Sequence, residues 1–227
     1  MIGDPTVPTT WRPQAFGRRA ARHIEDPLVE PLWSGIRVLA HATPRGAQFL
    51  DAQGGMQDWP EVALALAGAL AADDAVLDGY LTTEAASDGT GVTTGTFTPI
   101  RPGDMARQLL MGGERSRRGD LADALEAAAP PVFEVGDVLV FVAVDLLRID
   151  GESLLDVPLL ERKRLLDGVL IEGPLVRRGI HVKPPIDVWI STWKSLGFRS
   201  LAYKQSNSRY RPGEPNDDWA TASIPRN

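Results

Sequence analysis

A glutamate, a glycine and an arginine near the N-terminus have the types and the spacing that would suit a nucleotide pocket. They are Glu30, Gly35 and Arg37 in the segment EPLWSGIRVLAH. Such a pocket would also need a lysine near position 32, because a covalent nucleotide intermediate requires a nucleophilic side chain. Leu32 stands there instead, and no lysine precedes Lys163. We therefore predict a binding segment without a catalytic residue.

Other chemistry is hard to build from the remaining residues. The three histidines, His23, His41 and His181, are far apart and have no carboxylate at ligand spacing, so no metal site is predicted. The chain has no cysteine, which excludes disulfides, thiolate metal sites and cysteine nucleophiles. The glycine-rich stretch at 87–98 lacks the P-loop and Rossmann patterns and is predicted to be a loop.

Composition is that of a soluble globular protein and bounds the partners. The 227 residues are enough for one large domain, with 43% hydrophobic and 24% charged residues. No apolar run reaches the ~18 residues of a membrane span, and no signal-peptide core is present, so we expect a cytoplasmic protein that contacts no membrane. The excess of arginine over lysine is typical of GC-rich bacterial genomes. The net charge of -6 argues against nucleic-acid binding over the whole surface.

Strands and helices are predicted in mixed order, which favours the α+β class. Apolar alternation and one uninterrupted apolar run predict strands at 35–43, 47–52, 75–84, 138–147 and 198–205. Helical periodicity predicts helices at 59–74, over most of 101–130, at 158–170 and at 187–197, the last with Gly197 as its C-cap. Residues 1–25 look like an arm, and the segment after residue 205 is turn-rich.

Two long segments resemble the ATP-dependent DNA ligases. In VFVAVDLLRIDGESLLDVPLLERKRLL (140–166), a strand with Asp-Leu-Leu precedes an apolar-Asp-Gly turn, a Pro-Leu pair and a basic helix start, as in that family. GFRSLAYKQSNSRYRPGEPNDDWATAS (197–223) resembles the family's nucleotide-binding strand and the loop after it. With these anchors, AVLDGYLTTE (75–84) falls on the family's Leu-Asp-Gly-Glu, and EPLWSGIRVLAH falls on its Glu-x-Lys-x-Asp-Gly-x-Arg.

The resemblance implies a fold and a division of the chain. The implied fold is the nucleotidyltransferase (adenylation-domain) fold of DNA ligases, in which two antiparallel sheets are flanked by helices and a nucleotide cleft lies between them. Residues 26–227 would form this domain after the arm at 1–25, without an OB-fold domain. The strands at 138–147 and 198–205 are expected to line the cleft.

Several positions depart from the family's pattern, which puts catalysis in doubt. Leu32 stands at the family's nucleophile, Ser34 at its motif aspartate and Val144 at its adenine-stacking aromatic. Tyr80 and Arg199 stand at the first and second metal carboxylates, and Thr221 and Ser223 at the two tail lysines. Because Mg²⁺ prefers carboxylate oxygens, these changes should remove the family's metal site. The tryptophan that precedes the tail lysines survives as Trp219.

The polar residues that remain could still bind a nucleotide. By the family's pattern, Glu30 would face the adenine amino group, Arg37 the ribose and Lys204 a phosphate, beside Gly35 and Val144. No cofactor is certain, and ATP or AMP would be held non-covalently. Each residue also has a plain structural explanation: a solvated loop glutamate, an arginine paired with a structural carboxylate, or a glycine that serves a turn. The residues expected to meet at the cleft are Leu32, Tyr80, Val144, Arg199 and Lys204.

Four functions fit this sequence. The favoured one is a ligase-like pseudoenzyme that binds DNA ends or a DNA-repair partner, because Arg199, Lys204, Arg209 and Arg211 would form a basic cluster for phosphate contacts. The second is a divergent but active ATP-dependent DNA ligase or nucleotidyltransferase, for which no substitute nucleophile lies nearby in the sequence. The third is a regulator that binds an adenine nucleotide without chemistry. The fourth is a structural subunit that docks through residues 1–25.

Overall fold

The computed structural model describes residues 10–83 and 138–225. The strands in these ranges are β1 (Ala15–Phe16), β2 (Pro27–Pro31), β3 (Ile36–Thr43), β4 (Gly46–Asp51), β5 (Met56–Gln57), β6 (Ala75–Thr82), β7 (Val140–Ile149), β8 (Glu152–Ser153), β9 (Val176–Arg178), β10 (Ser200–Gln205), β11 (Pro215–Asn216) and β12 (Trp219–Ser223). The helices are α1 (Pro60–Ala69), α4 (Leu159–Val169) and α5 (Asp187–Ser195), with a 3-10 turn, η1, at Ala21–His23. None of these helices is long and apolar enough to cross a membrane.

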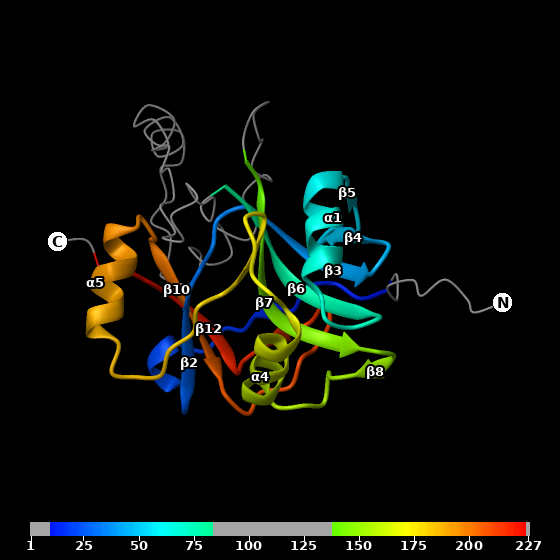
Figure 1. Cartoon of the computed structure of the whole chain (residues 1–227). Coiled ribbons are helices and arrows are strands. Elements are labelled where there is room, and N and C mark those ends of the chain that lie inside the picture. Colours follow the sequence, from blue (N-terminus) through cyan, green and yellow to red (C-terminus); the bar gives the residue numbers. More distant parts are fainter. Residues whose placement is uncertain (1–9, 84–137, 226–227) are drawn as a thin grey trace.

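Two mainly antiparallel sheets form the framework (Figure 1). The larger sheet has the order β5-β4-β3-β6-β7-β8, and β9 pairs in parallel with β7. The smaller sheet has the order β12-β10-β2. Helices α1 and α4 lie against the larger sheet, whereas α5 lies beside the smaller one (Figure 1). The α+β architecture with two antiparallel sheets, expected from the sequence, is confirmed.

The larger sheet carries the main core because its central strands are buried on both faces. All eight residues of β6 and the first eight of β7 are buried. On the face toward α1 and α4, the rings of Phe49 and Phe141 lie 5.6 Å apart. Gly79 allows β6 and β7 to approach, since a Cβ there would lie 2.5 Å from both the Phe141 ring and the Val142 carbonyl oxygen.

The smaller sheet has two different faces because its side chains alternate. On the outer face, Val29 and Leu201 pack with Trp193 of α5. On the inner face, Lys204 lies opposite Trp219 in the β10–β12 pairing. Trp219 then packs against apolar residues of the larger sheet, including Leu39. This contact joins the two sheets and places polar side chains between them.

Most predicted elements in the described ranges are confirmed, with two corrections. The helix predicted at 59–74 ends at Ala69, because the chain becomes extended at Leu70 and pairs there with Leu170. The segment after residue 205 is more than turns, since β12 begins at Trp219 and pairs with β10. The loop predicted at 87–98 and the helix predicted over 101–130 lie outside the described residues.

Candidate functional site

The position expected to hold a nucleophile lies where the chain leaves β2. The Leu32 N–H donates to the Ser200 carbonyl oxygen at 3.0 Å, which extends the β2–β10 pairing. The chain then crosses to β3 through Gly35, which has a φ of 129°. A Cβ at this glycine would lie 2.2 Å from the Leu81 carbonyl oxygen. The backbone path therefore requires Gly35, and no nucleotide is needed to explain it.

Apolar side chains fill the space between the end of β2 and the larger sheet. We call this group the inter-sheet cluster, and its members are Leu32, Trp33, Tyr80, Val140, Val142, Val144 and Phe198. Trp33 and Phe198 meet edge to face, with ring centres 4.9 Å apart. Three of the residues expected to meet at the cleft do meet here. They form a packed apolar contact, and the Trp33 Nε1 atom is buried without a hydrogen-bond partner among the described residues.

Glu30 is buried in β2 between two lysines. Its Oε1 lies 2.6 Å from Lys163 Nζ and its Oε2 lies 2.8 Å from Lys204 Nζ, and all three side chains are at most 3% exposed. Burial by itself would raise the pKa of Glu30, but the two ammonium groups outweigh it and lower the pKa to about 2. Burial, reinforced by Lys163, lowers the pKa of Lys204 although Glu30 opposes the shift. The solvated glutamate considered above is therefore wrong, because both carboxylate oxygens are engaged inside the protein.

The Glu30 cluster, defined as Glu30, Lys163 and Lys204, differs in geometry on its two sides. Lys204 donates a hydrogen bond to Glu30 and its Nζ lies 4.4 Å from the centre of the Trp219 ring. The Lys163 contact is an ion pair without hydrogen-bond alignment. The cluster thus holds two cations for one anion, and its stability depends on a single carboxylate.

Arg37 lies in the same buried region and is paired with a carboxylate. Its Nε and Nη2 donate to the two oxygens of Asp78 at 3.1 and 2.8 Å. Its guanidinium carbon lies 5.7, 5.9 and 6.0 Å from the ring centres of Phe16, Tyr80 and Trp219. Burial by itself would lower the pKa of Arg37, but Asp78 raises it well above its ordinary value. Arg37 therefore has the plain structural explanation considered above, and the carboxylate that pairs with it is Asp78.

A second buried pair fixes α4 to the larger sheet. Arg162 donates from Nε and Nη2 to the two Asp145 oxygens at 2.8 and 2.7 Å, and both side chains are fully buried. Its Nη1 also donates to the carbonyl oxygen of Ser208 at 3.2 Å. Bidentate geometry of this kind holds both groups in one orientation. Asp145 is therefore occupied by a structural pairing next to Val144.

The four basic residues expected to form one cluster do not form it. Lys204 is buried against Glu30, so it is not on the surface that DNA could contact. Arg199 is exposed just before β10, whereas Arg209 and Arg211 are exposed after the other end of that strand. A strand of six residues spans about 20 Å. The exposed arginines therefore make two separate basic sites.

The polar side chains between the sheets do not form a recognisable metal centre. Within residues 10–83 and 138–225, no group of three or more histidine, aspartate or glutamate side chains is arranged to hold a metal ion. His41, one of the histidines considered above, is buried, and its Nε2 lies 2.6 Å from Asp74 Oδ1. It belongs to a structural pair away from Glu30.

Lys163 is the site residue that the sequence analysis left apart from the pocket. It follows position 32 by more than half the chain, yet its ammonium group reaches Glu30, two residues before Leu32. The buried residues of α4 are Leu159, Arg162, Lys163 and Leu166. Their spacing is that of one helix face, and it could have indicated a buried ion pair. Leu165, on another side of the same helix, is 40% exposed.

Comparisons with known proteins agree with this fold. No protein-family model matches the chain. It is 27% identical over 207 residues to a DNA ligase of Pyrobaculum calidifontis, a match that covers 89% of this chain and 29% of that ligase. Its structure is similar to the ligase domain of M. tuberculosis LigD, with a TM-score of 0.62, 21% identity, and coverage of 96% of this chain and 61% of that one. A mycobacterial DNA ligase D complexed with ATP and MES gives a TM-score of 0.61 at 20% identity, with 94% and 60% covered.

These matches define the class of the protein. The chain has the nucleotidyltransferase fold of DNA-ligase adenylation domains, as its sequence predicts. Its resemblance to the ATP-dependent DNA ligases is confirmed. The chain spans only 29% of the length of the ligase that it matches in sequence and about 60% of the two structural relatives.

Proposed function

We propose that the protein is a DNA-ligase-like adenylation domain that has lost self-adenylation and acts by binding. The observation that carries this proposal is the inter-sheet cluster. Apolar side chains pack together at the positions where the resemblance places the nucleophile and the adenine-stacking ring, Leu32 and Val144. Tyr80 joins them where a metal-binding carboxylate is expected. A leucine has no lone pair with which to attack phosphorus.

The polar residues that survive from the family's pattern support the same proposal. Glu30 is bound by two lysines and Arg37 by Asp78, so these groups are already neutralised inside the protein. A nucleotide would have to compete with these ion pairs for the same atoms. Breaking a buried pair from one side is costly, because it leaves an uncompensated charge.

The test of this proposal is a search for a covalent adenylate. The protein is incubated with ATP labelled in the α-phosphate and Mg²⁺, and is then examined by denaturing electrophoresis and intact mass measurement. The ligase domain of M. tuberculosis LigD serves as the positive control. We expect no label and no added AMP mass on this chain. An AMP adduct on any of the four lysines would overturn the proposal.

The binding partner that we propose is a DNA end, or a DNA-repair protein that is held at one. Arg209 and Arg211 support a DNA contact, because both are exposed and lie close together in one loop. Fluorescence anisotropy with nicked and blunt-ended duplexes should show binding that weakens with salt. Arg209→Glu with Arg211→Glu should reduce it, whereas Arg164→Glu on the exposed side of α4 should not. Absence of binding at low salt would contradict a DNA contact and favour the protein partner. We place this role in a bacterial cytoplasm, in line with the composition of the sequence.

A second candidate function is non-covalent binding of an adenine nucleotide. It is favoured by one observation, the convergence of Arg37 and Lys204 on the Trp219 ring. In addition, one structural relative is a mycobacterial DNA ligase D complexed with ATP. This candidate predicts binding of ATP without a covalent product, which the same mass measurement and a titration distinguish.

A further inference from the structure

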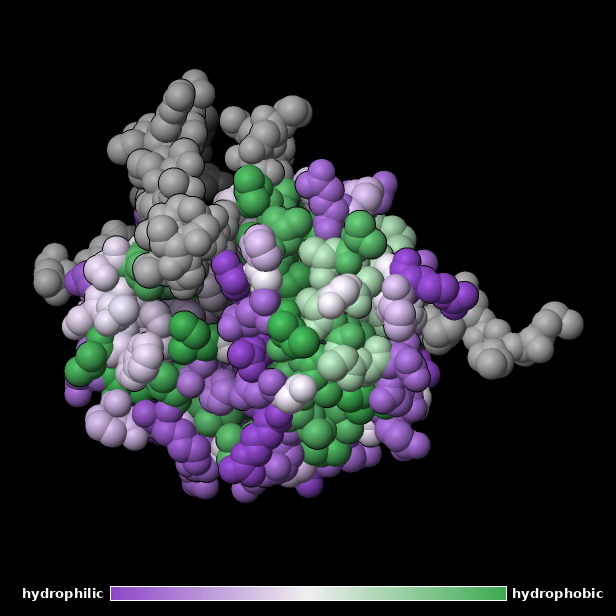
Figure 2. All heavy atoms as spheres, in the orientation of Figure 1, coloured by the Kyte–Doolittle hydropathy of each residue, from purple (hydrophilic) through white to green (hydrophobic). Residues whose placement is uncertain are grey.

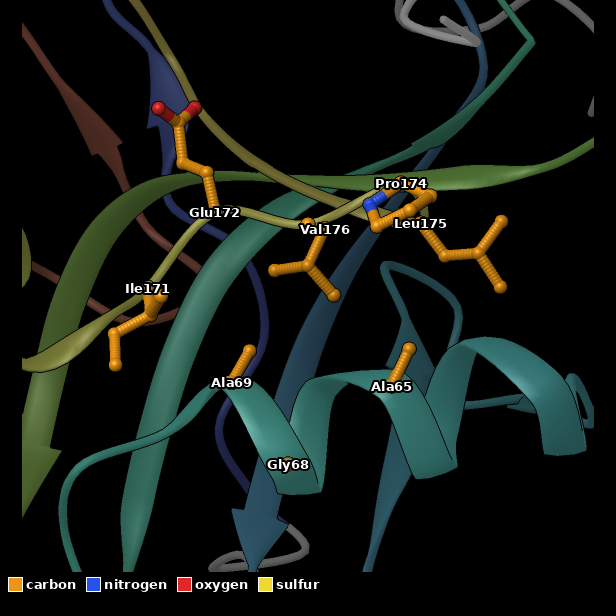
Figure 3. Close-up of a pocket in the computed structure, with 9 residues that line it drawn as sticks. Ala65, Gly68, Ala69, Ile171, Glu172, Pro174, Leu175 and Val176 are labelled. Atoms are coloured by element: carbon orange, nitrogen blue, oxygen red, sulfur yellow. The ribbon is translucent and has the colours of Figure 1, made fainter. Parts of the chain in front are cut away.

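An apolar groove on the α1 side of the larger sheet is unsuited to a charged ligand. It runs between α1 and the segment that leads into β9, and its volume is about 370 Å³. Ala65 and Ala69 of α1 point toward this segment in Figure 3, and Figure 2 shows hydrophobic side chains over the same face. Among the residues that line the groove, Glu172 is the only charged one, and its charge would repel a phosphate. A nucleotide or a DNA strand would therefore gain little from this groove.

The first described residues of the chain lie along the loop between β10 and β12. We call residues 10–19 the strap, and its strand β1 pairs in parallel with β11 of that loop. These two strands form a sheet of their own, so the strap adds no strand to either main sheet. Beyond β1, the Gly17 N–H donates to the Trp219 carbonyl oxygen at 2.9 Å. Detaching the strap would therefore leave the strand pairing within both main sheets intact.

Phe16 brings the strap into contact with the polar groups between the sheets. Its ring centre lies 5.7 Å from the guanidinium carbon of Arg37 and 5.9 Å from the centre of the Trp219 ring. Tyr80 and Trp219, which also lie near this guanidinium, belong to the main sheets, whereas Phe16 belongs to the strap. Guanidinium groups and indoles both attract flat rings. The Phe16 ring therefore occupies a position that the ring of a nucleobase could take.

A chain of hydrogen bonds ties the strap to Arg37. The backbone N–H of Gln14 donates to the Tyr210 hydroxyl at 2.8 Å, and that hydroxyl donates to Asp78 at 2.8 Å. Asp78 in turn accepts from Arg37. The Gln14 side-chain oxygen accepts from the Arg211 N–H, but its Nε2 is buried without a hydrogen-bond partner among the described residues. A buried donor without a partner costs free energy, which favours release of the strap.

We propose that the strap occludes a nucleobase site, in which a base replaces the Phe16 ring against Arg37 and Trp219. This inference rests on the proposed binding of a DNA end or an adenine nucleotide. The exposed Arg209 and Arg211 lie in the loop that the strap follows, so their side chains are available for phosphates beside the base. Aromatic stacking next to basic side chains is a common way to bind single-stranded nucleic acid. An unpaired DNA end and a free nucleotide both supply a base of this kind.

Removing the Phe16 ring should strengthen binding of a base to the full chain. Phe16→Ala should bind a labelled single-stranded oligonucleotide, followed by fluorescence anisotropy, or AMP, followed by calorimetry, at least about tenfold more tightly than the wild type. An abasic oligonucleotide of equal length should show no gain. Trp59→Ala, at a partly buried ring on the α1 side of the larger sheet, is the control and should leave both affinities unchanged. A gain for the oligonucleotide alone assigns the site to a DNA end, and a gain for AMP alone assigns it to a free nucleotide.

A reversible lock tests the same proposal without removing any packing from the site. Ala15 and Pro215 are partners in the β1–β11 register, and the chain contains no cysteine. In the variant with Ala15→Cys and Pro215→Cys, oxidation should weaken binding of the base-containing probe at least about fivefold, and reduction should restore it. Equal binding by the oxidised and reduced forms would overturn the proposal, as would a Phe16→Ala variant that binds both probes no more tightly than the wild type. Neither result would alter the test for an AMP adduct, so the strap and the loss of self-adenylation stand or fall separately.

Discussion

The inter-sheet cluster and the Glu30 cluster both lie between the two sheets, and they depart from a nucleotide site in opposite ways. In the inter-sheet cluster, Leu32, Tyr80 and Val144 pack together at positions where the resemblance predicts groups that do chemistry. In the Glu30 cluster, the polar groups are kept but bind one another. One region is held by apolar packing, and the other by charged groups that bind one another.

This difference predicts how each region should respond to substitution. Apolar packing contributes in proportion to buried area and tolerates exchange between apolar residues of similar volume. A buried ion pair tolerates removal of both charges far better than removal of one. Removing the single carboxylate of the Glu30 cluster should therefore lower the free energy of unfolding by a large amount. A substitution in the inter-sheet cluster should lower it by less.

The largest effect is expected for Glu30→Gln. The free energy of unfolding, measured by urea denaturation, should fall by about 3–5 kcal/mol, because two buried ammonium groups lose the carboxylate that pairs with both of them. Glu61→Gln on the exposed side of α1 is the matched control and should change it by less than about 0.5 kcal/mol. The variant with Glu30→Leu, Lys163→Met and Lys204→Met should recover much of the loss. Unaltered stability of Glu30→Gln would show that the three charges are not coupled.

Low pH should reduce the contribution of the same cluster to the free energy of unfolding, by somewhat less than Glu30→Gln does. The pKa of Glu30 is about 2 in the folded protein, against an ordinary value of 4.5. Because the folded-state pKa is the lower one, its contribution is complete above pH 4.5 and is lost as the pH falls toward 2, by roughly 3 kcal/mol. The difference in unfolding free energy between the wild type and Glu30→Gln should shrink across this window. A difference independent of pH would contradict the ion-pair account.

Truncating a side chain of the inter-sheet cluster should lower the free energy of unfolding by less than Glu30→Gln does. Phe198→Ala should lower the free energy of unfolding by about 2 kcal/mol, because Phe198 is half-buried and loses its contact with Trp33. Phe198→Leu should cost less than about 1.5 kcal/mol. Leu196→Ala, at a 40% exposed position in the same segment, is the control and should have a minor effect. Losses as large for the leucine variant as for the alanine variant would mean that the contact is specific to aromatic rings.

A lysine placed at position 32 should have the smallest effect of these changes, because we expect it to restore no self-adenylation. We expect Leu32→Lys to form no AMP adduct in the labelled-ATP assay, because Tyr80 and Arg199 still replace both metal-binding carboxylates. Leu196→Lys controls for labelling of an added surface lysine. A lysyl-AMP adduct specific to Leu32→Lys would show that the nucleophile is the only defect.

Much of the fold could be predicted from the sequence because local patterns dominate it. The apolar run that becomes β7 and the alternating runs that become β3 and β4 were placed to within a few residues. The short strands escaped prediction, since β12 is stabilised mainly by its pairing with β10. The end of α1 also depends on a distant segment, because Leu70 pairs with Leu170.

The site was predictable in composition but not in its contacts. The resemblance predicts that Leu32 and Tyr80 stand where the family has functional residues, and the structure places both in the inter-sheet cluster. It does not show that Lys163 reaches Glu30, because that contact joins residues far apart in the chain. It also suggested one basic cluster that includes Lys204, whereas alternation along β10 turns that residue inward.

Isothermal titration calorimetry with ATP, in the absence and in the presence of Mg²⁺, tests the central claim most directly. That claim is that, within residues 10–83 and 138–225, packed side chains fill the space between the sheets and no group of carboxylates there is arranged to hold a metal ion. It predicts that Mg²⁺ does not strengthen ATP binding, and that any heat observed reflects weak binding near Arg37 and Lys204. Tight ATP binding that becomes tighter with Mg²⁺ would contradict it, because such binding requires an open pocket and a metal site.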